Sequence, residues 1–94
     1  MENNFWEQFN NNKRAYVLAP LAGITDSAFR QICKGFGADV VYSEMVSATA
    51  LFYNDEKTID LMQFEKQESP YVIQLFGSEP KHFDIATKFI EKNK

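Results

Sequence analysis

The chain has 94 residues, of which 45% are hydrophobic and 15% aromatic, and its formal net charge is −3. This composition is typical of a globular protein and unlike that of a disordered segment. Its ten Lys and Arg residues are spread along the chain, so the basic stripe of a protein that binds RNA by itself is absent. The single cysteine, Cys33, excludes an intramolecular disulfide and a multi-cysteine metal site.

Residues 1–13 are polar and rich in Asn, with Phe5, Trp6 and Phe9 at helical spacing. They predict an N-terminal extension that contains a short amphipathic turn or helix. The first residues lack the basic and apolar regions of a secretion signal, and no apolar run reaches the roughly 20 residues of a membrane-spanning helix. We therefore expect a cytoplasmic protein with no membrane association and no bound metal.

Strands and helices are expected to alternate along residues 14–94. Apolar runs predict strands at residues 16–19, 39–43 and 70–75. Apolar side chains at steps of three and four predict helices at residues 26–36, in two pieces within 46–65, and from 78 onward. Residues 63–69 are expected to form a charged loop.

Polar residues at the helix starts set the expected boundaries. Thr25 or Asp26 can cap the first helix, and Asn54 and Asp55 divide the second helical region. Ser78 is expected to cap the last helix. Strands that alternate with helices imply a parallel sheet with right-handed crossovers, either an open doubly wound sheet or a barrel. The pattern alone does not separate these two folds.

In both folds, the chemistry lies at the carboxyl ends of the strands. After the first strand, Pro20 stops sheet pairing, and the small Ala22 and Gly23 would let a flat ligand approach the backbone closely. The alternative is a tight turn that simply needs glycine. The sequence contains no Gly-x-Gly-x-x-Gly after this strand, so it lacks a dinucleotide-binding fingerprint.

Two further polar residues lie at strand ends. Glu44 follows the second expected strand and could orient a ligand, hold a neighbouring loop, or be a hydrogen-bonded structural residue. Gln74 interrupts the otherwise apolar third strand, and a buried amide needs partners. Its donor and acceptor match the pyrimidine edge of a flavin ring, although pairing with the backbone would also satisfy it.

Three other residues are weaker candidates for chemistry. Cys33 lies in the apolar stripe of the first helix, where a free thiol usually behaves as a small hydrophobe. His82 falls on the polar side of the last helix and is expected to be solvated. Arg30 is flanked by core positions, so we expect its side chain to snorkel or to pair with an acid.

Three segments together resemble the tRNA-dihydrouridine synthase family. They are YVLAPLAGITDSAFR at residues 16–30, GADVVYSEMVS at residues 37–47 and PYVIQLFGSEP at residues 70–80. The resemblance implies the first three βα units of a TIM (β/α)8 barrel, an incomplete α/β fold in which residues 14–94 are the N-terminal part of an FMN-binding domain. It also implies that Pro20, Leu21 and Ala22 lie against the flavin with Gly23 close by, and that Gln74 hydrogen-bonds the ring. Leu21 replaces the commoner Met of the family, and its similar volume predicts little effect.

The family resemblance implies an NADPH-driven reduction of tRNA uridine to 5,6-dihydrouridine, with FMN as the cofactor. The proton donor of the family is a cysteine in an Asn-x-Gly-Cys-Pro loop after the fourth strand, and we expect it to lie beyond residue 94. Cys33 is not that residue, so no catalytic residue is expected in this chain. We therefore expect an N-terminal fragment that is inactive alone, with tRNA bound by the remainder of the protein.

Two alternatives remain open from the sequence. The first is another FMN-dependent TIM-barrel oxidoreductase, similar to dihydroorotate dehydrogenase. The second is a non-enzymatic small α/β module that has kept the start of a barrel. An Asn-x-Gly-Cys-Pro loop in the following sequence would support the synthase, whereas cooperative folding of the 94-residue chain as a monomer would favour the small module.

Overall fold

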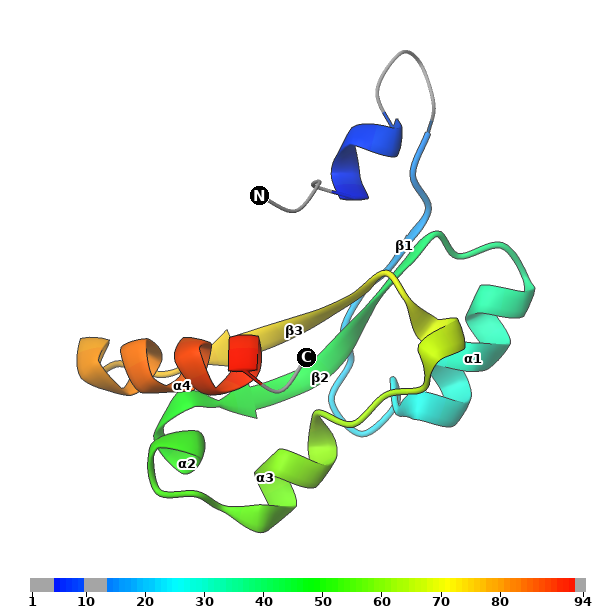
Figure 1. The fold of residues 1–94 in the computed structure, drawn as a ribbon. Helices are drawn as coiled ribbons and strands as arrows, with labels where there is room; N and C mark the ends of the chain where they lie inside the picture. Colours follow the sequence, from blue (N-terminus) through cyan, green and yellow to red (C-terminus); the bar gives the residue numbers. More distant parts are fainter. Residues whose placement is uncertain (1–4, 10–13, 93–94) are drawn as a thin grey trace.

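The computed structural model describes residues 5–9 and 14–92 (Figure 1). Its strands are β1 (Val17–Leu18), β2 (Val40–Ser47) and β3 (Tyr71–Phe76). Its α-helices are α1 (Ser27–Gly35), α2 (Ala48–Phe52), α3 (Glu56–Leu61) and α4 (Pro80–Lys92), and two 3-10 helices are η1 (Phe5–Phe9) and η2 (Lys66–Glu68). Of the predicted extension at residues 1–13, η1 is described, and the rest lies outside the described residues.

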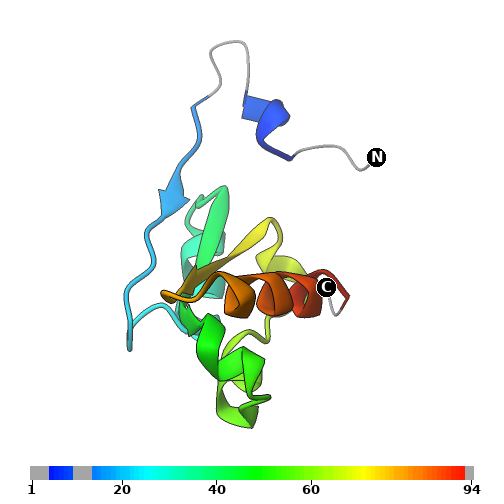
Figure 2. The ribbon, with the colours of Figure 1, turned by 90° about the vertical axis from the view of Figure 1, so that its left-hand side faces the viewer.

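The strands form one parallel sheet in the order β1-β2-β3, which confirms the predicted α/β arrangement. Figure 2 shows β1 on one side of the molecule and the end of α4 on the other. Neither outer strand has a second partner strand among the described residues. The structure therefore shows a three-stranded parallel sheet with helices, which is the arrangement expected at the start of a barrel.

The second strand is longer than predicted because it contains a bulge. The paired residues on either side of the bulge are Tyr42 with Val72 and Met45 with Gln74. Between these pairs β2 contains Ser43 and Glu44, whereas β3 contains a single residue. Pairing resumes beyond the extra residue, so the prediction that the strand ends at residue 43 is wrong, and Glu44 lies within the strand.

Side-chain caps fix most of the helix starts. The carboxylate of Asp26 accepts the Phe29 N–H at 2.8 Å, which selects Asp26 over Thr25 as the cap of α1. Asp55 caps α3 as predicted. The last helix begins one residue later than the Ser78 cap predicted, because the Glu79 carbonyl accepts from the N–H of Phe83 at 3.3 Å.

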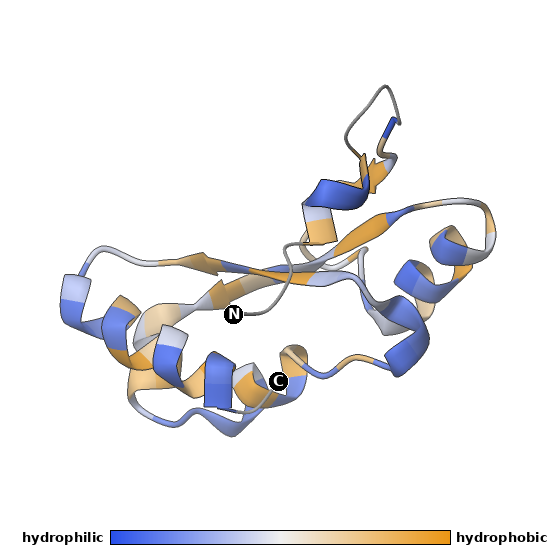
Figure 3. Cartoon of the chain, turned by 45° about the horizontal axis from the view of Figure 1, so that its top comes forward, coloured by the Kyte–Doolittle hydropathy of each residue, from blue (hydrophilic) through white to orange (hydrophobic). Residues whose placement is uncertain are grey.

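The hydrophobic core lies between the sheet and helices α2, α3 and α4. Its buried members are Val46, Ala48, Leu51, Met62 and Ala86. Gly77 allows α2 and α4 to approach here, since a Cβ at this position would lie 3.3 Å from the side chains of both Ala48 and Phe83. In Figure 3 the strands are coloured mostly as hydrophobic, whereas the helices carry both hydrophobic and hydrophilic residues.

The apolar stripe predicted for α1 is not covered in this structure. Phe29, Ile32 and Phe36 are 39%, 60% and 91% exposed, whereas Arg30 on the same helix is buried. The predicted helix forms, but the prediction that its apolar face lies in the core is wrong for the described residues. An uncovered stripe of this size usually marks a surface that packs against something else.

Candidate cofactor site at the strand ends

Four of the residues predicted to contact a cofactor form the turn after β1: Pro20, Leu21, Ala22 and Gly23. The Leu21 carbonyl accepts hydrogen bonds of 3.0 Å from the backbone N–H groups of both Ile24 and Thr25. Gly23 has a φ of +77°, in the left-handed region that glycine adopts without strain. Pro20 is half-buried and the next three residues are exposed, so the turn lies at the surface.

Glu44 connects the second strand to this turn. Its Oε1 accepts a hydrogen bond of 2.6 Å from the backbone N–H of Gly23. A bulge re-aims the side chains of the strand that carries it, and Glu44 is one of the two bulged residues. Two site residues predicted from separate strand ends are therefore in direct contact.

Gln74 joins the same group of residues through Ser43. The fully buried Ser43 hydroxyl accepts from the Gln74 N–H at 3.0 Å and donates to the Glu44 carbonyl at 2.7 Å. The hydroxyl thus replaces a sheet hydrogen bond that the bulge disrupts. Gln74 is linked to the Pro20–Gly23 turn through β2, and no direct hydrogen bond joins the two among the described residues.

The side chain of Gln74 lies on the face of the sheet that the core does not use. Met45 pairs with Gln74 and Val46 pairs with Leu75, and the second pair packs in the core. Because successive side chains alternate between faces, Gln74 and the 46%-exposed Met45 lie on the opposite face. Gln74 Oε1 is buried yet has no hydrogen-bond partner within residues 5–9 and 14–92. A buried acceptor without a donor costs about 1–3 kcal/mol, so it is a candidate ligand contact.

The sequence did not reveal a buried ion pair behind the turn. Arg30 Nε donates to Glu68 Oε1, and both side chains are at most 2% exposed. Arg30 therefore pairs with an acid, one of the two outcomes predicted for it. The prediction that residues 63–69 form a charged loop is wrong for Glu68, which lies in η2 and is 0% exposed. Glu65 and Glu68 form a capping box around η2, but the first position lacks the Ser or Thr of the usual sequence signature, so no clear signal of this turn is present in the sequence.

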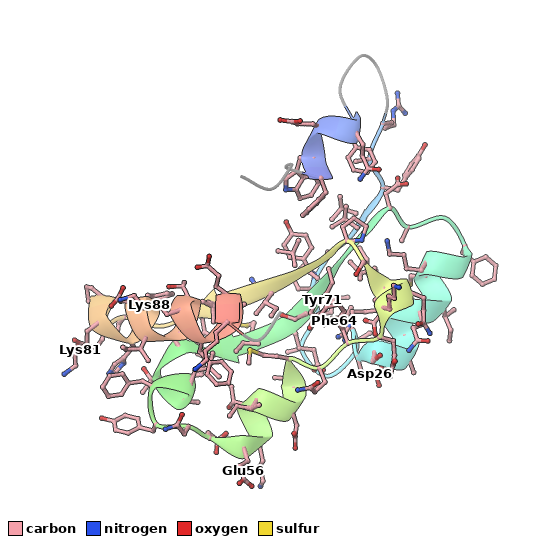
Figure 4. The ribbon with its side chains drawn as sticks, viewed as in Figure 1. Asp26, Glu56, Phe64, Tyr71, Lys81 and Lys88 are labelled. Atoms are coloured by element: carbon pink, nitrogen blue, oxygen red, sulfur yellow. The ribbon has the colours of Figure 1, made fainter. Side chains whose placement is uncertain are left out.

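Tyr71 and Phe64 complete the surroundings of this ion pair. Arg30 Cζ lies 4.8 Å from the centroid of the Tyr71 ring, and the ring stacks on Phe64 at 4.3 Å (Figure 4). Burial raises the pKa of the Tyr71 hydroxyl above its ordinary value, and the nearby Arg30 charge opposes this shift. The guanidinium is therefore held against an aromatic face that stays neutral at physiological pH.

His82 is buried rather than solvated as predicted, with an exposed fraction of 7%. Its Nδ1 lies 2.8 Å from Thr49 Oγ1, and its ring lies 4.4 Å from that of Phe52. The polar side of α4 faces α2 here, and the hydroxyl satisfies the ring nitrogen. His82 is therefore a packing residue between two helices and lies outside the group formed by Gly23, Glu44 and Gln74.

Cys33 is half-buried and lines an apolar cavity of about 490 Å³ with Val17, Leu18 and Phe36. This cavity lies between α1 and the outer edge of β1. Residues 5–9 and 14–92 contain no cluster of three or more His, Cys, Asp or Glu side chains suited to a metal ion. Within the same ranges, no helix combines the length and apolar character that crossing a membrane requires.

The sequence of this chain is similar to that of known proteins. The sequence profile described as "Dihydrouridine synthase (Dus)" matches residues 17–94. A probable tRNA-dihydrouridine synthase of Aquifex aeolicus is 40% identical over 83 residues, which cover 88% of this chain and 26% of that protein. A probable tRNA-dihydrouridine synthase of Helicobacter pylori is 45% identical over 67 residues, covering 71% of this chain and 20% of that protein.

A third relative, tRNA-dihydrouridine synthase B of Vibrio parahaemolyticus, is 34% identical over 86 residues, or 92% of this chain and 26% of that protein. The chain thus spans only about a quarter of the length of these relatives. The profile match begins at the first residue of β1 and includes the Gly23 turn, Glu44 and Gln74. The chain belongs to the dihydrouridine synthase family.

Proposed function

We propose that this chain forms part of the FMN site of a tRNA-dihydrouridine synthase, a cytoplasmic enzyme that uses NADPH to reduce uridine in tRNA to 5,6-dihydrouridine. The observation that carries the proposal is the hydrogen-bonded group of Gly23, Glu44, Ser43 and Gln74. It joins the turn after β1 to residues within the neighbouring parallel strands β2 and β3. Barrel enzymes hold their ligands at the end of the sheet where such turns follow the strands. Family membership supplies the reaction class.

The residues present fit a flavin on three observations. Gln74 Oε1 is a buried acceptor with no donor in the described residues, and a flavin carries a ring N–H. A Cβ placed on Gly23 would meet no heavy atom within 4 Å, so there is open space beside the turn. Leu21, Ala22 and Gly23 are exposed, so a flat ring can reach this side of the turn.

When bound, FMN would supply the hydride chemistry that no protein side chain provides. Pro20, Leu21, Ala22 and Gly23 would contact the flavin, and Gln74 would accept a hydrogen bond from its ring. Glu44 would hold the Gly23 N–H and thereby fix the shape of the turn. Cys33 would take no part in proton transfer, because it lines the cavity between α1 and the outer edge of β1.

Neither outer strand of the sheet has a second partner strand in the described residues, and this determines how much of the site we assign to this chain. A cavity of about 740 Å³ lies beside β3 and is lined by apolar residues that include Ile73, Leu75 and Ile90. The smaller cavity beside β1 lies at the other edge. In our proposal further barrel strands pair with both edges, as in a TIM barrel. The 94-residue chain alone would then bind FMN weakly, lack synthase activity and leave the tRNA contacts to other parts of the enzyme.

A chimera tests the proposed function directly. The segment of this chain that matches the Aquifex aeolicus relative would replace the corresponding segment of that protein. We expect the chimera to purify with FMN and to raise the dihydrouridine content of unmodified tRNA, measured by mass spectrometry of nucleosides. A folded chimera that lacks flavin, or that carries flavin but oxidises dihydroorotate instead, would contradict the proposal.

A further inference from the structure

Arg30 makes three directional contacts from a buried position. Its exposed fraction is 1%. Besides Glu68, its guanidinium donates to the Thr25 carbonyl at 2.8 Å and to the Gln63 carbonyl at 3.2 Å. These acceptors belong to the segment before α1, the segment after α3 and η2. Arg30 therefore ties the turn region to a part of the chain 38 residues away.

The carboxylate partner is itself held in place by several donors. Glu68 Oε2 accepts from the Ser27 hydroxyl at 2.5 Å and from the Glu65 N–H at 2.8 Å. Both carboxylate oxygens are therefore occupied. A buried ion pair is rigid when its remaining hydrogen-bonding positions are satisfied in this way, and a partly satisfied one is strongly destabilising.

Thr25 links the buried ion pair to the candidate cofactor site through hydrogen bonds. Its hydroxyl accepts from the Leu21 N–H at 3.0 Å and lies 3.2 Å from the Leu21 carbonyl, to which it can donate. Thr25 is 0% exposed, whereas Leu21 is 49% exposed. One buried threonine thus connects the Arg30 guanidinium, through its carbonyl, to the exposed turn, through its hydroxyl.

We propose that Arg30 and Glu68 position the Pro20–Gly23 turn through the buried Thr25. Glu44 holds the same turn from the sheet through the Gly23 N–H. The turn contains a glycine at positive φ, and its last three residues are exposed, so side-chain packing does little to order it. That an ordered turn matters for flavin binding rests on the proposed function. The coupling between Arg30 and the turn is independent of the proposed function.

Backbone hydrogen exchange, followed by NMR on the flavin-free chimera, tests the coupling. The reporter is the Leu21 amide, and the matched control is the Ala50 amide, which likewise donates to a hydroxyl, that of Ser47, at 3.1 Å. In Arg30→Lys a single ammonium cannot reproduce the fork of contacts. We expect exchange at Leu21 to accelerate about tenfold more than exchange at Ala50.

Two substitutions at Thr25 separate positioning from general stability. Thr25→Val keeps the backbone carbonyl that Arg30 contacts but removes the hydroxyl, so Leu21 exchange should accelerate as it does in Arg30→Lys. Thr25→Ser keeps the hydroxyl and should restore slow exchange at Leu21. Equal acceleration at Leu21 and Ala50 in Arg30→Lys, or unchanged Leu21 exchange in Thr25→Val, would overturn the proposal.

The same substitutions in the chimera address the flavin. We expect Arg30→Lys and Thr25→Val to lower the bound FMN per protein and Thr25→Ser to retain it. A parent chimera that folds but does not bind FMN would count against the proposed function alone, because the exchange results are measured without flavin. Full flavin content in Arg30→Lys would show that the coupling does not serve the site and would overturn that part of the inference.

Discussion

The backbone N–H of Gly23 and the carboxylate of Glu44 form a hydrogen bond of 2.6 Å between residues 21 positions apart. This bond joins the turn after β1 to the bulge in β2. A charged acceptor makes such a bond stronger than one between neutral groups. Replacement of Glu44 therefore has a defined structural consequence, which is the release of Gly23.

Glu44→Ala in the chimera is expected to weaken FMN binding about tenfold, since a hydrogen bond to a charged group contributes about 1.5–3 kcal/mol. Glu56→Ala is the matched control, because Glu56 is an exposed glutamate in the first turn of α3 (Figure 4). The measurement is quenching of flavin fluorescence during titration of the flavin-free protein. Equal flavin affinity in the two variants would show that Glu44 does not support the site.

Gly23→Ala tests the backbone conformation of the turn. The φ of +77° is unfavourable for alanine by about 1–2 kcal/mol, although the added methyl group would meet no neighbour within 4 Å. Gly35→Ala is the control, because Gly35 lies in α1 with equally open space and without a positive φ. We expect urea unfolding to show a loss of stability in Gly23→Ala and none in Gly35→Ala. A loss in both would point to a cause other than φ.

The sequence predicted the order of strands and helices because apolar periodicity and capping residues are local signals. Asp26 and Asp55 cap the helices that their positions indicated. The parallel sheet followed from the alternation of elements. The bulge at Glu44 could not be predicted in the same way, because it depends on the register of β2 against β3.

The predictions that were wrong concern residues whose interaction partners are distant in the sequence. Glu68 lies in a charged stretch that is locally typical of a solvated loop, and it is buried because Arg30, 38 residues earlier, neutralises it. His82 lies on the polar side of α4 and is buried because Thr49 and Phe52 of α2 cover it. A local sequence pattern shows whether a side chain is polar. It does not show which distant residue covers that side chain and buries it.

Gln74→Leu is expected to change stability and flavin binding in opposite directions. Loss of the unpaired Oε1 from a buried position should stabilise the flavin-free chimera by about 1 kcal/mol or more, measured by urea unfolding. The same substitution in the chimera should reduce its FMN content, because the ring loses its acceptor. A destabilised chain would mean that Gln74 has structural partners, and full flavin content would remove it from the site.

The raised pKa of Tyr71 predicts that the folded chain loses stability at alkaline pH. Burial raises the pKa of its hydroxyl in the folded chain, so the neutral form is favoured by folding. Its stabilising contribution is therefore complete below the ordinary tyrosine pKa of about 10 and is lost as the pH rises through the higher pKa of the folded chain. The ionised phenolate would also be held beside the buried Glu68 carboxylate, which disfavours it further.

Tyr71→Phe isolates this effect. The phenolic hydroxyl donates a long hydrogen bond of 3.3 Å to the Met62 carbonyl and also interacts with the Ser43 hydroxyl, so its removal should cost about 1 kcal/mol at neutral pH. The aromatic face beside Arg30 and the stack on Phe64 remain in the variant. Urea unfolding of the chimera at roughly pH 8 and roughly pH 11 should show a smaller loss of stability in the variant than in its parent. Equal losses would mean that other groups cause the alkaline sensitivity and that the Tyr71 hydroxyl titrates alike in the folded and unfolded chain.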